Sequence, residues 1–591
     1  MNKTGLSTLR ALRASLRAAW AAAPGSLVLS LVAVLLIGAL PPAQLWLVGL
    51  LVAEVAAGAS LAHLVVPVVA IGLLLGVMAG VNSLQSAATK RLEFAVSAWA
   101  QDRLLRSAAR QSPAAIERPE ERDALEADWE TARGRVGPLM MMLFTWMGQI
   151  VTVVGTVVVL LQFSVLGTLL IVAAVLPPLF AVPAMFRAHS RAYEETAALD
   201  RVTVALGTFT VSPDGFTDAT AAHYQPALQR THRSFVQQSH EQHLHAVNVE
   251  TRVLLWSALA TAACVVAGLL TMFHAGTLTA AGVAVVVASV TVMGVLVNVV
   301  FSAGELVRDS LFVGRFLDRV GAVERQPELA PRRSHAGLRA LTTQDLGFTY
   351  PASSAPALTS VNVAFRTGQI ACIVGRNGSG KSTLLKLLAG IYEPTEGTVE
   401  SVGGDVAATL AVLSASVMQG LPQPPILLRE YLLGDQPISD DTILAEASTL
   451  GIDFLTPEML DRRIGREFRD GVAVSGGQWQ RLAVLRLMLS PEPVWILDEP
   501  SSALDPEGEL QIMDALRSAS RDRIVVIVTH RASTAVRGDR VILIDDGKVA
   551  LDAPPDIATT DETFQRLFAA QLLPAPDESS TTPTHDAPPG A

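Results

Sequence analysis

Gly375-Arg-Asn-Gly-Ser-Gly-Lys-Ser382 is the stretch around which the second half of the chain is organised. It has the form G-x-x-x-x-G-K-S of a phosphate-binding loop, or P-loop. The apolar run Ile370–Val374 before it predicts a buried strand, and Thr383–Ala389 after it predicts the first turns of a helix. In this context backbone N–H groups and a helix N-terminus surround an anion. A chance glycine-rich turn is the alternative, and the lysine, the serine and both flanks argue against it.

The P-loop also predicts individual ligand contacts. Lys381 is expected to reach the β- and γ-phosphates of a nucleotide, and Ser382 is expected to bind Mg²⁺. The other predicted contacts with the nucleotide are Gly375, Asn377, Gly378, Ser379, Gly380 and Thr383. Backbone N–H groups make many of the phosphate contacts in such a loop. The glycines allow the backbone to take the path that these contacts require.

The composition indicates a membrane protein. Half of the 591 residues are hydrophobic and only 17% are charged, against about 25% in ordinary soluble domains. The formal net charge of −10 gives no reason to expect nucleic acid as a partner. The two cysteines, Cys264 and Cys372, have no metal-binding spacing and cannot form a disulfide framework.

Six apolar segments fill the first half of the chain, each near the ~20 residues that cross the hydrocarbon core of a bilayer. They are residues 27–52, 61–84, 139–161, 164–187, 253–273 and 279–303. Buried helices of a soluble protein are the alternative, which the number and length of the segments disfavour. Prolines such as Pro41 and Pro42 are tolerated in membrane helices when neighbouring groups satisfy the freed carbonyls.

Lysine and arginine placement predicts the orientation of these segments. Basic residues precede the first segment and recur in the loops 85–138 and 188–252, whereas none lies between Arg17 and Lys90. The N-terminus, both long loops and everything after the sixth segment are therefore expected in the cytoplasm. The short loops are expected outside, near residues 53–60, 162–164 and 274–278.

The two long cytoplasmic loops are predicted to be helical hairpins. Their charged, alanine-rich sequences indicate that the spans continue into the cytoplasm as helices. Each hairpin has a break at its tip, at Ala114–Arg118 and at Ser212–Gly215, where we expect a short cross-helix.

The whole chain divides into five predicted regions. They are a cytoplasmic lead-in, a six-helix membrane domain, a linker, a soluble α/β domain and a disordered tail rich in Pro, Ser, Thr, Asp and Glu. Their expected ranges are 1–22, 23–320, 321–337, 338–570 and 571–591.

Two further motifs lie in the soluble domain. Val494–Glu499 is an apolar strand that ends in two acids, of which Asp498 would bind Mg²⁺ through water and Glu499 would polarise an attacking water. Val474–Gln478 precedes the helical pattern Trp479–Leu489 and offers a second anion site at a helix N-terminus. A strand with an acidic turn and an ordinary N-cap are the respective alternatives.

Taken in order, these motifs resemble the nucleotide-binding domain of ATP-binding cassette (ABC) transporters. The resemblance rests on Tyr350, the P-loop, Gln419, the signature 474–478, the acidic strand 494–499, Ser502–Asp505, and His530 after the apolar strand Ile524–Thr529. Together with the six apolar segments, residues 10–570 resemble an exporter-type half-transporter, with a membrane α-helical domain followed by an α/β P-loop NTPase domain.

The resemblance implies a role for each matching residue. Tyr350 would stack on adenine, and Gln419 would be a catalytic residue that senses Mg²⁺ and the membrane domain. Glu499 would be the catalytic base, with Lys381 and His530 at the γ-phosphate. Residues that would act on the ATP of the other chain are Ser475, Gly476, Gly477, Gln478 and Asp505. The breaks at the two hairpin tips would be coupling helices.

The function implied by the resemblance is ATP-driven export by alternating access, with hydrophobic drugs, lipids or modified peptides as substrates. An importer with the exporter fold, carrying a siderophore-like substrate, and a non-transporting regulatory ATPase are the alternatives. The implied location is a bacterial inner membrane. No catalytic position is degenerate, so a homodimer suffices and is preferred to a heterodimer with a different half.

Some features depart from the family pattern or favour an ordinary structural interpretation. Val474 stands where leucine is usual in the signature, and Ser212–Ala219 lacks the charged run often found in the second coupling region. A solvated helix face is favoured over a metal site for the cluster His240, His243 and His245. The polar residues that stand out inside the spans are Gln44, Gln149, Asn82 and Asn298. A cavity without obvious buried charge favours an apolar or amphipathic substrate.

Overall fold

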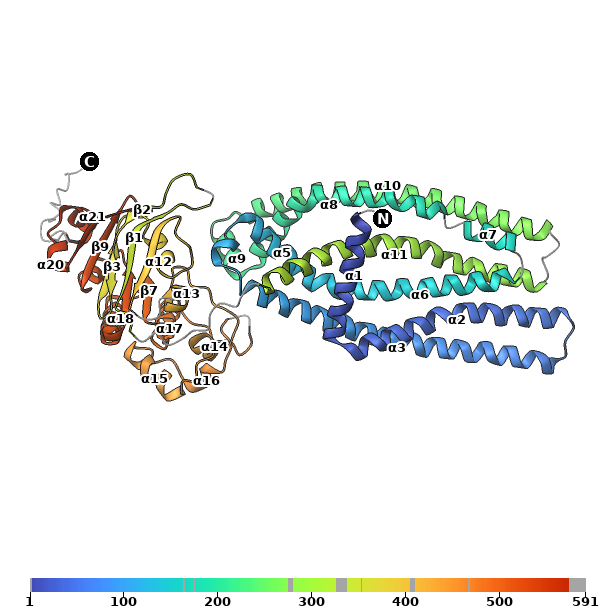
Figure 1. The fold of residues 1–591 in the computed structure, drawn as a ribbon, viewed down its shortest axis with the longest axis horizontal. Coiled ribbons are helices and arrows are strands. Elements are labelled where there is room, and N and C mark those ends of the chain that lie inside the picture. Colours follow the sequence, from blue (N-terminus) through green and yellow to red (C-terminus); the bar gives the residue numbers. More distant parts are fainter. Residues whose placement is uncertain are drawn as a thin grey trace, which may run out of the picture. The chain divides into compact units, whose positions relative to one another are not determined.

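The computed structural model describes most of the chain and divides it into two compact units (Figure 1). The first unit comprises residues 1–110 and 123–326, and the second comprises residues 111–122 and 327–591. The described residues are 3–162, 165–173, 176–274, 280–325, 337–351, 353–403, 410–465 and 468–572.

The first unit consists of long helices. They are α1 (Lys3–Ala22), α2 (Pro24–Ala56), α3 (Leu61–Ala108), α5 (Pro119–Gly134, which begins in the second unit), α6 (Val136–Leu161), α7 (Val165–Ala173), α8 (Leu176–Val211), α9 (Pro213–Ala221), α10 (Gln225–His274) and α11 (Ala280–Glu324). Helix α2 packs along α3 and α6, and α8 packs along α10. A core of apolar side chains that includes Leu92, Val136 and Phe316 joins α3, α6 and α11.

Four helices among the described residues are long and apolar enough to cross a membrane: α2, α3, α6 and residues 225–268 of α10. These helices contain the predicted spans 27–52, 61–84 and 139–161. The fourth contains most of the predicted span 253–273, which continues five residues beyond residue 268. The other two predicted spans, 164–187 and 279–303, fall on α7 with the start of α8 and on α11. Each of them includes residues outside the described part of the chain, so the number of six spans stays a prediction.

The helical hairpins predicted beyond the spans are present. Helix α3 continues to Ala108, and the break after it contains α4 (Pro113–Ile116). Both breaks begin with the same Ser-Pro pair, in which the serine hydroxyl caps the helix and proline takes its first position. The Ser112 hydroxyl accepts from the N–H of Ala115, and the Ser212 hydroxyl accepts from the N–H of Gly215.

The second unit is built on a six-stranded sheet in the order β10-β9-β4-β8-β7-β6. Its pairs are parallel except β10 with β9. The strands are β4 (Ile370–Val374), β6 (Ser414–Val417), β7 (Val494–Asp498), β8 (Ile524–Val528), β9 (Arg540–Asp545) and β10 (Lys548–Ala553). A smaller antiparallel sheet contains β1 (Ala340–Phe348), β2 (Leu358–Val361), β3 (Ala364–Arg366) and β5 (Glu396–Val402).

The helices of the second unit surround these sheets. Besides α4 they are α12 (Lys381–Leu388), α13 (Leu410–Leu413), α14 (Leu428–Leu433), α15 (Asp440–Thr449), α16 (Pro457–Leu460), α17 (Gly476–Met488), α18 (Pro506–Ala519), α19 (Ala532–Ala535), α20 (Pro555–Ala558) and α21 (Glu562–Leu572), with a 3₁₀ turn at Ser520–Asp522.

The core of the second unit explains why its central strands are continuous apolar runs. Along β4, Cys372 belongs to one apolar cluster and its neighbours Ala371 and Ile373 belong to another, because alternate side chains point to opposite faces of the sheet. Parallel strands covered on both faces need apolar residues at every position. The carboxyl ends of β4, β7 and β8 therefore share one edge, and each leads directly into a predicted site residue.

Candidate nucleotide-binding and catalytic site

The loop after β4 has a backbone that requires glycine. Gly380 has φ +103°, and a Cβ atom there would lie 2.6 Å from the carbonyl oxygen of Ala357. Gly378 has φ +81° but open space around it, so only its backbone conformation disfavours other residues there. The loop leads straight into α12, as the sequence predicted.

Lys381 lies inside this loop. Its Nζ donates hydrogen bonds to the carbonyl oxygens of Gly375, at 2.9 Å, and Arg376, at 2.8 Å. Burial lowers the pKa of Lys381, and the charges of Asp498 and Glu499 oppose that shift. The ammonium group has three donors, so a phosphate oxygen could share or replace these carbonyl acceptors.

Asp498 ends β7 next to the P-loop. Its side chain is buried, which raises the pKa of Asp498, and hydrogen bonding with the Ser382 hydroxyl opposes this rise. A carboxylate beside a hydroxyl is a donor set that suits Mg²⁺, which takes oxygen ligands. Gln419 is exposed two residues beyond β6, the strand that pairs with β7. These three predicted Mg²⁺ ligands therefore lie at one edge of the sheet.

The side chains of Glu499 and His530 meet, with 2.8 Å between Oε1 and Nε2. The two residues follow β7 and β8, which are adjacent in the sheet. Glu499 has φ +53°, a left-handed conformation that costs a non-glycine residue of order 1–2 kcal/mol. Its N–H donates to the carbonyl oxygen of Val528 at 3.0 Å, which holds this backbone in place.

Gln480 is a residue that sequence reasoning missed. Its Nε2 donates to the carbonyl oxygen of Glu499 at 2.7 Å and to the Ser502 hydroxyl at 3.1 Å, and its Oε1 accepts from the N–H of Ala503 at 2.9 Å. Gln480 is 8% exposed. The sequence feature that could have identified Gln480 is a polar residue on the buried face of a predicted helix, because a buried polar side chain needs hydrogen-bond partners.

The signature residues begin α17. Ser475 caps the helix in a capping box with Gln478, so the ordinary N-cap that the sequence left open is present. Ser475 and Gly476 are exposed. A Cβ atom at Gly477 would lie 3.0 Å from the carbonyl oxygen of Ala503, so Gly477 packs against the turn before α18. Among the described residues, no hydrogen bond or ion pair joins 475–478 to the P-loop of the same chain.

Asp505 caps α18 and accepts a hydrogen bond from the N–H of Gly508 at 3.0 Å. Its side chain is 67% exposed and lies 3.9 Å from the Arg481 guanidinium. The side chain of Asp505 thus has a structural task and also faces solvent.

Tyr350 reaches the P-loop helix from the smaller sheet. Its hydroxyl lies 3.0 Å from the Thr383 hydroxyl. The ring makes edge contacts with Phe348 and Tyr392, with centroid distances of 5.0 and 5.7 Å. Tyr350 is half-buried and is held beside the start of α12.

The first break, in which a coupling helix was predicted, groups with the second unit. Ala114 packs against an apolar cluster of that unit, and Glu117 forms an ion pair of 3.5 Å with Lys386 of α12. The contact connects this break to the helix that follows the P-loop.

The histidine cluster lies elsewhere, on α10. His240, His243 and His245 are exposed, and the His243 Nε2 lies 3.4 Å from the Thr196 hydroxyl. Among the described residues, no group of three or more His, Cys, Asp or Glu side chains could hold a metal ion.

Comparison with known proteins identifies the central part of the second unit. Residues 358–502 match the family described as "ABC transporter". These residues form an ABC transporter domain. It is an ATP-binding domain that contains the P-loop, the signature, Asp498 and Glu499, whereas Tyr350, Asp505 and His530 lie outside the matched range.

Curated relatives match part of the chain. The nisin transport ATP-binding protein NisT of Lactococcus lactis is 34% identical over 39% of this chain and 39% of its own length. The mycobactin import ATP-binding/permease protein IrtB of Mycobacterium tuberculosis is 34% identical over 43% of this chain and 46% of its own. An ATP-dependent lipid A-core flippase of Alkalilimnicola ehrlichii is 34% identical over 34% of this chain and 36% of its own. The chain thus spans less than half the length of these relatives.

The fold extends the likeness beyond the ABC domain. A solved structure described as a bacterial Atm1-family ABC exporter with ATP bound covers 93% of this chain and 99% of its own, with a TM-score of 0.78 and 18% identity. The predicted fold class, a helical exporter-type region followed by an α/β P-loop domain, is confirmed.

Proposed function

We propose that this protein is an ATP-driven membrane transporter that exports a hydrophobic or amphipathic substrate by alternating access. The observation that carries the proposal is the pair Glu499–His530 at 2.8 Å, beside Asp498 and the P-loop, in a chain with an exporter fold. The geometry supports hydrolysis of a bound nucleotide, and the exporter fold supports its coupling to transport.

In the proposed hydrolysis, the carboxylate of Glu499 accepts a proton from the attacking water. Its left-handed backbone and its bond to His530 fix the direction in which the carboxylate points. Lys381 and the N–H groups of the P-loop hold the phosphates and stabilise the charge that develops on them. Mg²⁺, held by Ser382, Asp498 and Gln419, would supply further neutralisation of phosphate charge.

Assembly as a homodimer is the second part of the proposal. Ser475–Gln478 expose a helix N-terminus and make no hydrogen bond to the P-loop of their own chain among the described residues. We infer that they complete the site of a second chain and that Asp505 links the two sites. A heterodimer with a different half is the alternative.

The direction of transport has two candidates. Likeness to a nisin transport protein and a lipid A-core flippase supports export of a peptide or lipid. Likeness to the mycobactin importer IrtB supports the importer alternative, with a siderophore-like substrate. ATP-dependent accumulation inside inverted membrane vesicles indicates export, and ATP-dependent loss from preloaded inverted vesicles indicates import.

The test of the proposed chemistry is Glu499→Gln. We expect steady-state ATP hydrolysis to fall by at least about 10²-fold, the range for loss of a general base, while ATP still binds and the dimer stays closed. Glu507→Gln changes an exposed glutamate of α18 and is the matched control. Near-normal hydrolysis by Glu499→Gln would refute the assigned role.

A further inference from the structure

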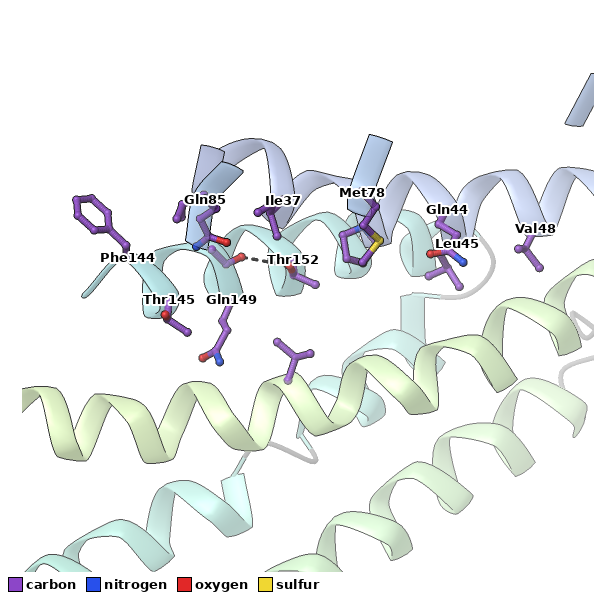
Figure 2. A pocket seen from close by; sticks show the side chains of 14 residues that line it. Ile37, Gln44, Leu45, Val48, Met78, Gln85, Phe144, Thr145, Gln149 and Thr152 are labelled. Atoms are coloured by element: carbon purple, nitrogen blue, oxygen red, sulfur yellow. Dashed lines mark hydrogen bonds between the residues drawn. The ribbon is translucent and has the colours of Figure 1, made fainter. Parts of the chain in front are cut away.

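The first unit contains a cavity of about 540 Å³ between α2, α3, α6 and α11 (Figure 2). Most of its lining is apolar, and among the residues that the structure describes no lysine, arginine, histidine, aspartate or glutamate lines it. The carboxamides of Gln44, Gln85 and Gln149 line it. The volume lies within the ~300–1,000 Å³ typical of sites for small organic molecules.

Two prolines change the hydrogen bonding of the cavity wall. Pro41 and Pro42 lie inside α2 and have no N–H, so the carbonyls of Ile37 and Gly38 lose their helical donors. The Thr152 hydroxyl of α6 lies 2.9 Å from the Gly38 carbonyl oxygen and 3.1 Å from the Gly148 carbonyl oxygen, so its single proton is shared between the two acceptors. Ile37 and Pro41 both line the cavity, so the position at which Pro41 supplies no N–H belongs to its wall.

The glutamines add donors and acceptors to the same wall. Within the described part of the chain, Gln44 and Gln85 have no hydrogen-bond partner, although both are half-buried. The Gln149 Oε1 accepts from the Ser302 hydroxyl at 3.2 Å, and Figure 2 draws Gln149 on the side of α6 that faces α11. An amide within a membrane helix is costly unless it is paired, so unsatisfied carboxamides around a cavity point to an occupant that pairs with them.

From this arrangement we propose that the cavity is a binding site for an uncharged, mainly apolar molecule that carries amide or hydroxyl groups. The apolar wall buries the body of the ligand. Gln44 and Gln85 pair with its polar groups. A carboxylate or ammonium finds no counter-charge here and would lose its hydration, so ions are excluded. The inference rests on the proposed transport function only for what happens to the ligand after binding.

The test measures binding directly, without nucleotide. The probe is radiolabelled N-decanoyl-leucinamide, a neutral amide, and its matched ion is N-decanoyl-leucine, which is anionic at pH 7.5. Full-length protein in phosphatidylcholine nanodiscs is compared with empty nanodiscs, which report partition into lipid. We expect saturable binding of the amide and at least about tenfold weaker binding of the acid.

Variants locate the site. Gln44→Leu combined with Gln85→Leu keeps the size of both side chains and should raise the Kd at least about tenfold, the effect of 1.4 kcal/mol. Val48→Phe fills the cavity and should also weaken binding. Asn82→Leu is the matched control, because Asn82 is exposed on α3 and does not line the cavity. Size-exclusion profiles establish that each variant is folded.

Several outcomes would overturn the site: binding no greater than to empty nanodiscs, equal affinity for amide and acid, or equal Kd values for the Gln44/Gln85 variant and the Asn82 control. The measurements can reject the binding site and the transport function independently of each other. Saturable binding without any effect of the amide on ATP hydrolysis or flux supports the site and counts against coupling. Hydrolysis and flux of another compound without amide binding reject the site alone.

Discussion

The side-chain amide of Gln480 donates a 2.7 Å hydrogen bond to the main-chain carbonyl of Glu499. Gln480 belongs to α17, the helix that begins with the signature, and Glu499 follows β7. In the proposed dimer, the signature of one chain contacts the ATP held by its partner, whereas Glu499 acts on the ATP of its own chain. The bond therefore joins elements that serve two different nucleotides.

The first prediction concerns this bond. Gln480→Ala removes the partner of a strained backbone but leaves the P-loop intact, so kcat should fall about tenfold with little change in KM for ATP. Gln480→Glu keeps the acceptor for the Ala503 N–H but loses the donor to Glu499, and it should show a similar loss. Gln565→Ala, an exposed change on α21, is the control. An unchanged kcat, or a rise in KM as large as the fall in kcat, contradicts a positioning role.

A second prediction separates the ring of Tyr350 from its hydroxyl. Tyr350→Ala removes the proposed adenine contact, and base stacking on aromatic rings is worth ~1–3 kcal/mol in nucleic-acid complexes. The KM for ATP should therefore rise about tenfold or more. Tyr350→Phe loses only the bond to Thr383, and Tyr350→Trp keeps an aromatic face, so both should stay near the native KM. An alanine variant with native KM would show that adenine binds elsewhere.

Shared ATP sites predict complementation between two defective chains. Lys381→Ala damages the P-loop, and Gly477→Asp places a carboxylate at the signature where it repels the γ-phosphate. Each homodimer has two damaged sites, whereas a mixed dimer combines both defects in one site and leaves the other intact. Vanadate trapping of nucleotide should return in the purified mixed dimer. Trapping no greater than in either homodimer would argue against sites shared between two copies of this chain.

The predicted orientation can be tested with cysteines placed at exposed residues. Ala57→Cys, after α2, should react with an impermeant maleimide in intact cells, whereas Glu126→Cys, on α5, should react only after permeabilisation. Both cysteines should be introduced into a variant that lacks Cys264. Cys372 can remain, because it is fully buried and burial raises the pKa of its thiol to about 12. The reverse labelling pattern would invert the proposed topology.

A pH dependence is expected from Asp128 on α5. Burial raises its pKa from 3.8 to about 6, although the guanidinium of Arg319, 3.3 Å away, acts in the opposite direction. Because the folded-state pKa is the higher one, the contribution of Asp128 to stability is complete below pH 3.8 and is lost as the pH rises through about 6.

Asp128→Asn should remove this loss. The melting temperature of the variant relative to that of the native protein should therefore be higher at pH 7.5 than at pH 4.5. Asp102→Asn, at an exposed pair with Arg106, is the control and should show no such trend. A greater loss of stability at pH 7.5 than at pH 4.5 would mean that the Arg319 pair outweighs burial.

Much of the fold and part of the site follow from local sequence. A P-loop is a run of consecutive residues, and the strand and helix beside it show their own apolar patterns, so β4 and α12 lie where they were predicted. The same holds for β7 and β8. Helices α2, α3 and α6 each contain an apolar run long enough to cross a bilayer. These features need no knowledge of distant contacts.

Only the tertiary structure decided which of these pieces meet. Glu499 and His530 are 31 positions apart and pair because β7 and β8 are adjacent in the sheet, an order that no local pattern specifies. Gln480 is buried because α17 packs across the turn after Glu499. The cavity beside Pro41 exists because α2, α3, α6 and α11 converge there. In each case the deciding interaction joins residues from different elements, and packing of whole elements, not the sequence of any one, brings them together.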